Sequence, residues 1–173
     1  MLITIAPAAV EPVSLSEAKS HLRVIHNADD ALIGSLITSA REVVELNTGR
    51  ALEAASYLWT SDGGCWPVRI PLWPVAEITE VSYADSDGLR VPITDYVFDV
   101  DRSLLTFRNN ASLTTLNVAF TTAPTHVPAA LKAAILLLVG DLYEHAEANA
   151  AQTLSENPTL DRLIFPHRIN LGV

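Results

Sequence analysis

Apolar residues recur at helical spacing soon after the start of the chain. Leu15, Ala18 and Leu22 fall on one face of a helix. Ser14 and Glu17 stand at the spacing of a capping box, in which each side chain bonds the other residue's backbone N–H. The pattern therefore predicts a first helix that begins directly after Ser14.

A second helix is predicted between Asp29–Asp30 and Gly49. The acidic pair suits the positive end of a helix dipole, and glycine suits a C-terminal cap. The apolar positions predict one stripe of Leu32, Leu36, Ala40, Val43 and Asn47, with Ile33, Ile37 and Val44 beside it. Because this face is wide, we expect the helix to pack against more than one neighbour.

From about Leu52 to Thr122 the period changes to two, which is typical of strands. The predicted strands centre on Tyr57–Thr60, Val68–Ile70, Ile78–Tyr83, Tyr96–Phe98, Leu104–Phe107 and Leu116–Phe120. Turn-forming Asp, Asn and Gly residues separate them. Short strands at this spacing favour a small antiparallel sandwich or half-barrel.

The most apolar run, Leu131–Ala148, predicts a third helix. Its uncharged core, Ala133–Gly140, is too short for a bilayer, which needs about 20 residues. The helix is apolar nearly all round, so we expect it to be buried on most sides, with a neighbouring subunit covering the remainder. A polar stretch follows Asn149, and the apolar, basic ending is expected to dock on its own body or on a partner.

These patterns predict an α+β fold. Two N-terminal helices and a long C-terminal helix form a bundle, with an antiparallel β-rich insertion and an extended C-terminal tail. The predicted parts are a helical part at 1–51, the β-rich insertion at 52–125, the final helix at 126–150, and a linker and docking tail at 151–173.

Charge and composition narrow the function. The formal net charge of −9 argues against a nucleic-acid-binding surface, since such a surface needs clustered Lys and Arg. A hydrophobic content of 49% favours oligomerisation, because buried interfaces resemble cores. The single Cys65 excludes a disulfide framework, and Pro7 interrupts an opening that also lacks the basic residues of a signal peptide.

Few residues suggest chemistry. No Gly-rich phosphate loop or GxSxG elbow occurs. Asp99 and Asp101, with Glu77 and Glu80, leave open a small acid-dependent glycan hydrolase, and the β part leaves open a carbohydrate- or receptor-binding module. Asp141, Glu144 and His145 are the nearest approach to a metal site, but a solvated helix end explains them better. We expect no enzyme activity, cofactor or metal.

Four motifs in series resemble the phage head–tail connector (adaptor) family, longer members with a β-rich insertion. They are VSLSEAKSHLRVIHNADDALIGSLITSAREVVELNTGRAL, IPLWPVAEITEVSYADSDG, VPAALKAAILLLVGDLYEHAEA and LIFPHRI. Two departures stand out: His145–Ala146–Glu147 replaces the usual Asn-Arg-Glu, and His167 stands where Tyr is common.

The resemblance implies a structural protein at the head–tail junction of a phage or gene transfer agent particle, present in the bacterial cytoplasm during assembly. Such proteins form a ring, commonly a dodecamer, between the portal protein and the next tail component, a stopper or tail terminator. DNA passes through without specific binding, and no membrane is involved.

The resemblance and the apolar pattern together assign three sets of residues. The expected portal-docking tail comprises Arg162, Leu163, Ile164, Phe165, Pro166, His167 and Arg168. The expected ring interface comprises Leu36, Ala40, Leu136, Leu137 and Tyr143. The acids expected to line the channel, where negative charge repels DNA, are Asp29, Asp30, Asp141 and Glu144.

Overall fold

A computed structural model describes residues 1–7, 10–62, 67–85, 87–107, 115–124, 126–147 and 158–169. The chain divides into two compact units. A β unit contains residues 1–10, 53–124 and 171–173, and a helical unit contains residues 11–52 and 125–170. Each unit has its own hydrophobic core, so each is described by itself.

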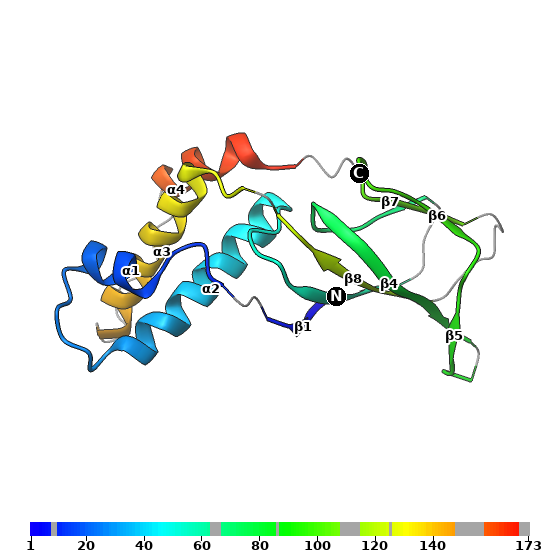
Figure 1. Cartoon of the computed structure of the whole chain (residues 1–173), viewed down its shortest axis with the longest axis horizontal. Helices are drawn as coiled ribbons and strands as arrows, with labels where there is room; N and C mark the ends of the chain where they lie inside the picture. Colours follow the sequence, from blue (N-terminus) through cyan, green and yellow to red (C-terminus); the bar gives the residue numbers. More distant parts are fainter. Residues whose placement is uncertain are drawn as a thin grey trace. The chain divides into compact units, whose positions relative to one another are not determined.

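The helical unit packs three helices and a short carboxyl-terminal element around one core (Figure 1). The elements are α1 (Leu15–Leu22), α2 (Asp30–Thr48), α3 (Ala129–Glu147), α4 (Pro158–Ile164) and the 3-10 turn η1 (Phe165–His167). Helix α2 contacts α1, α3 and α4, which confirms the expectation of several neighbours. Within the described residues, no helix is long and apolar enough to cross a membrane.

The predicted caps of the first two helices are confirmed. The backbone N–H of Glu17 donates to Ser14 Oγ at 3.3 Å, and the Ser14 N–H donates to Glu17 Oε2 at 2.8 Å. Helix α1 ends at Arg23, a non-glycine residue in the left-handed region with φ 59°. Helix α2 ends at Gly49, also left-handed, whose N–H donates to the Glu45 carbonyl at 2.8 Å.

The buried face of α2 differs from the predicted first stripe by one position. The residues that enter the core are Ile33, Ile37, Ala40 and Val44, continued by Arg41, Glu45 and Thr48. Leu32, Val43 and Asn47 are exposed. The row that enters the core is therefore the predicted secondary row, Ile33, Ile37 and Val44, joined by Ala40.

The β unit contains two antiparallel sheets. The first has the order β1-β2-β8-β4-β5 and the second β3-β7-β6. The strands are β1 (Leu2–Ala6), β2 (Ser56–Ser61), β3 (Val68–Arg69), β4 (Val75–Ala84), β5 (Arg90–Pro92), β6 (Tyr96–Asp99), β7 (Leu104–Phe107) and β8 (Leu116–Thr122). Both sheets contribute to one core, in which Tyr57 stacks on Phe120 with ring centroids 5.5 Å apart.

The α+β prediction is confirmed, and all six predicted strands are present. Strands β1 and β5 were not predicted. Leu2–Ala6 lies in the predicted helical part at 1–51, but it forms β1 and pairs with β2 in the β unit, so that assignment is wrong for these residues. The predicted linker around 151–157 lies outside the described residues.

Candidate interaction surfaces

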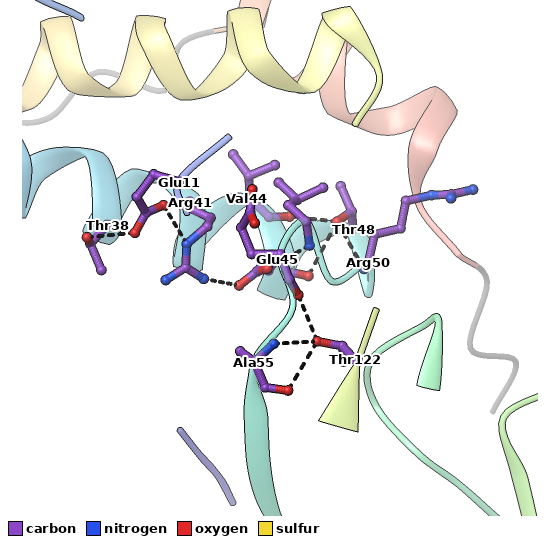
Figure 2. A network of polar contacts seen from close by, with 11 residues as sticks. Glu11, Thr38, Arg41, Val44, Glu45, Thr48, Arg50, Ala55 and Thr122 are labelled. Carbon is purple, nitrogen blue, oxygen red and sulfur yellow. Dashed lines mark hydrogen bonds and ion pairs between the residues drawn. The ribbon is translucent and has the colours of Figure 1, made fainter. Parts of the chain in front are cut away.

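A polar cluster centred on the buried Arg41 and Glu45 of α2 contacts both ends of the segment 11–52. Figure 2 shows Arg41 between Glu11 and Glu45. Arg41 Nε donates to Glu11 Oε2 at 2.8 Å, and Arg41 Nη1 donates to Glu45 Oε2 at 2.6 Å. Glu45 Oε1 accepts the Leu52 backbone N–H at 2.7 Å, and Thr38 Oγ1 donates to Glu11 at 2.9 Å. The cluster therefore fixes both ends of this segment in the helical unit.

Glu45 and Arg41 are almost fully buried, and their charged groups lie 2.6 Å apart. Burial raises the pKa of Glu45 above its ordinary value, while the Leu52 N–H and the Arg41 guanidinium act in the opposite direction. Two charge-assisted hydrogen bonds to an ionised carboxylate favour the ion pair at neutral pH. The cluster is a structural feature, since each of its polar groups is directed at another part of the same unit.

A second apolar row runs along α2, here named the α2 outer stripe: Leu32, Val43 and Leu46 face outward, and Leu36 lies at its border with the core. With Ser39 these positions are separated by four, three, four and three residues, the spacing of a helix–helix seam. Leu46 is 70% exposed and Leu36 is half-buried. Ala40 is 0% exposed, so its assignment to the ring interface is wrong: it faces the core of its own unit.

Helix α3 is more enclosed than its composition suggested. Leu131, Ala134, Ile135 and Val139 are buried in the core. The half-buried Leu136 and Tyr143 pack against the same core, and Leu137 is also half-buried. Among the described side chains of α3, no large apolar residue is exposed. Elsewhere in the helical unit, Leu32, Val43 and Leu46 form an exposed row on α2, and the exposed Leu15, Ile25 and Phe165 lie apart from it in the sequence.

The carboxyl-terminal segment folds onto the helical unit. Ile164 is 1% exposed and belongs to the core, with Leu160 and Leu163 packed beside it. Arg50 Nε donates to the His167 carbonyl at 2.8 Å, and the Ile169 N–H donates to the Thr48 carbonyl at 2.7 Å. The expected extended tail is therefore helical between Pro158 and Ile164.

Part of this segment still faces outward. Phe165 is 70% exposed, and the Arg168 guanidinium lies 5.9 Å from the centre of its ring. Arg162 and Pro166 are exposed as well. Ile164 cannot dock on another protein without leaving its core, so its assignment to the docking tail is wrong. Of the residues predicted for the docking tail, Arg162, Phe165, Pro166 and Arg168 face outward, and Leu163 and His167 are half-buried.

The four predicted channel acids gather at one end of the helical unit. Asp29 and Asp30 lie at the start of α2, and Tyr143 on α3 donates its hydroxyl to Asp29 Oδ2 at 2.7 Å. Asp30 pairs with Lys19 at 2.6 Å. On α3, Asp141 is half-buried and Glu144 is exposed. Asp29 and Asp30 are thus committed to local contacts, and Glu144 is the most accessible of the set.

Asp99 and Asp101, two of the four carboxylates considered for hydrolysis, do not lie on one strand. Asp99 ends β6, and Asp101 lies in the turn that follows. The Asp99 carboxylate accepts the Arg102 N–H at 3.1 Å, as a turn-closing aspartate does. Among the residues that the structure describes, no three His, Cys, Asp or Glu side chains are placed to hold a metal.

Comparison with known proteins gives matches in sequence and in fold. Residues 12–76 match the family model of the phage gp6-like head-tail connector protein. The head completion protein gp6 of Enterobacteria phage HK97 is 43% identical over 42 residues, which span 24% of this chain and 39% of that protein. The predicted resemblance to the head–tail connectors is confirmed.

Solved structures extend the likeness in fold to nearly the whole chain. A chain in the neck of an empty GTA particle, computed with C6 symmetry, matches with a TM-score of 0.70 at 22% identity, covering 97% of this chain and 95% of that one. A chain in the neck of a native GTA particle, computed with C12 symmetry, gives 0.69 at 21%, covering 97% and 94%.

The connector-like region, residues 12–76, contains the Ser14 capping box and α2 with Arg41 and Glu45. Arg41 neutralises two acids of its own unit, Glu11 and Glu45. Glu11 precedes the first helix and binds Arg41 and Thr38 of α2. Because residues four apart on a helix lie side by side, the spacing of Arg41 and Glu45 could have predicted their ion pair. No such local spacing predicts the contact of Arg41 with Glu11.

Proposed function

We propose that this chain is a head–tail connector of a tailed phage or a gene transfer agent particle, a structural protein that joins the capsid to the tail. The observation that carries the proposal is the fold match over 97% of the chain to neck proteins of such particles, together with the connector family model at residues 12–76. In this role the chain forms a ring, of twelve copies by analogy with the C12 neck, between the portal and the next tail component.

The α2 outer stripe is the proposed ring contact in the helical unit, together with the half-buried Leu136, Leu137 and Tyr143 of α3. Leu32, Val43 and Leu46 are exposed in one subunit, and burying them against the next subunit would gain the free energy of removing apolar area from water. A ring contact is heterologous, so the stripe faces a different surface of its neighbour.

The outward residues Arg162, Phe165, Pro166 and Arg168 are the proposed portal contact. They stand on a backbone anchored by Ile164, so the docking surface is held rigid by the subunit's own core. The acids Asp29, Asp30, Asp141 and Glu144 are proposed to line the DNA passage, where negative charge prevents DNA from adhering.

The test is a mass measurement of the purified chain with and without the portal protein, followed by negative-stain imaging. We expect closed rings, at least when the portal is present, and Leu46→Lys should reduce them strongly while leaving the subunit folded. Leu89→Lys is the matched control, because Leu89 is as exposed but lies in the β unit. A strict monomer in the presence of the portal would overturn the proposal.

A further inference from the structure

The two sheets of the β unit end in four edge strands, and these edges differ in their capacity to pair. Strands β1 and β5 end the first sheet, and β3 and β6 end the second. An edge strand presents unpaired N–H and C=O groups that another chain can use, and proline is one device that prevents this.

Two of the edges are blunted. Strand β5 has three residues and ends in Pro92. Strand β3 has two residues, Val68–Arg69, with Pro67 and Pro71 close on either side. Strands β1 and β6 are longer and contain no proline, so they are the edges in the described part of the β unit that remain open to an added strand.

Strand β1 is only weakly protected: its register with β2 shifts between Thr4 and Ala6, and a bulge of this kind is one device that discourages further pairing. Its sequence, LITIA, has no charge, and Ile3 and Ile5 are 42% and 60% exposed. Such a strand in a stable protein is ordinarily covered, twisted away or charged. Strand β6 is also free of proline, although it ends in the charged Asp99; Tyr96 and Phe98 pack on the core, while Val97 is 50% exposed.

The hydrogen bonds between β1 and β2 show which backbone groups of β1 point away from β2 and are free to pair with another strand. Thr60 N–H donates to the Met1 carbonyl at 2.8 Å, and the Met1 amino group donates to the Thr60 carbonyl at 2.6 Å. Along an antiparallel pair of strands, residues that exchange backbone hydrogen bonds with the partner alternate with residues that do not. Since Met1 bonds to Thr60, the next residue to bond to β2 is Ile3. The backbone N–H and C=O groups of Leu2 and Thr4 point away from β2. The N–H of Thr4 is therefore available to a further strand.

We infer that β1 of one subunit pairs with β6 of the next, so that neighbouring β units join into a continuous sheet. The partner is a second copy of this chain. The two edges are different surfaces, as a ring contact requires, and both are free of proline and carry exposed aliphatic side chains. The inference rests on the proposed ring and adds a backbone contact in the β unit to the apolar contact proposed for the helices.

The test uses cysteine pairs in the full chain with Cys65→Ser, treated with a short bis-maleimide under the conditions of ring assembly. Ile3→Cys combined with Val97→Cys should give a ladder of covalent oligomers, and each substitution alone should give monomers. Adding Thr4→Pro should abolish the ladder, because it removes an outward N–H and leaves the bonds to β2 intact, whereas Thr4→Ala should keep it.

The other outcomes are distinguishable. Cross-linking by Ile3→Cys alone indicates that β1 pairs with another β1 and overturns the inference. Rings that form without a ladder in the double variant, or a ladder that survives Thr4→Pro, also overturn it while leaving the proposed function in place. Failure to form any ring with the portal overturns both.

Discussion

Replacing Arg41 by methionine tests the buried polar cluster. Met fills a similar volume without charge, and it leaves the Glu45 carboxylate buried with the Leu52 N–H as its remaining partner among the contacts described above. Removing one member of a buried ion pair destabilises a protein by about 3–5 kcal/mol, because the other charge stays uncompensated. Both side chains are almost fully buried, so solvent screening does not reduce this value.

The loss of unfolding free energy caused by Arg41→Met should depend on pH. Burial raises the folded-state pKa of Glu45, and the loss of Arg41, which lowers it, raises it further. When the pKa of a carboxyl is higher in the folded than in the unfolded state, the folded state binds its proton more tightly. The stability gained in this way is fully present below the unfolded pKa and is lost as pH rises through the folded pKa. The destabilisation by Arg41→Met should therefore be smaller in mildly acidic buffer than at neutral or alkaline pH.

The assay is urea unfolding followed by helical circular dichroism, with Arg162→Met as the control, since Arg162 is exposed. The double variant Arg41→Met/Glu45→Met should recover part of the lost stability, because it removes the stranded carboxylate. Equal losses in the single and double variants, or a deficit independent of pH, would refute the reasoning.

Other predictions concern the tail and the first helix. Ile164→Ala should cost about 2–5 kcal/mol in urea unfolding and expose the carboxyl-terminal segment to proteolysis, whereas Phe165→Ala should change stability by less than about 0.5 kcal/mol and reduce only the binding of the subunit to the portal. Ser14→Ala should destabilise α1 by about 1 kcal/mol. The hydrogen bonds from Ser14 lower the pKa of Glu17, so an NMR titration of Ser14→Ala should show that pKa rising. Because the folded pKa of Glu17 is depressed, the stability it contributes is present above its unfolded pKa and is lost as pH falls through the folded value.

Local signals in the sequence predicted the boundaries of the first two helices well. The Ser14 box and Gly49 each act within one turn of backbone, so their effect does not depend on distant residues. The core face of α2 was harder to predict, because Leu32 and Ile33 begin two rows of similar hydrophobicity. Which row enters the core depends on where α1, α3 and α4 lie, and that information is not local.

Strand β1 and the tail were misjudged for a related reason. LITIA is too short to show a clear period, and its partner, β2, lies beyond two helices. The tail gave an apolar signal that fitted docking on its own body or on another protein. In the structure Ile164 is buried in the core of its own unit, while Phe165 is exposed. Composition cannot reveal that two adjacent apolar residues differ in this way.

The pairing of β1 with β2 also constrains the order of events as the chain is made. Strand β1 is synthesised before α1 and α2, yet its hydrogen-bonding partner is not translated until both helices are complete. The central strand β8, which pairs with β2 and β4, comes later still. The sheet therefore assembles late, and until then the uncharged strand β1 is exposed to other nascent chains, so a chaperone that shields it would improve the yield of subunits.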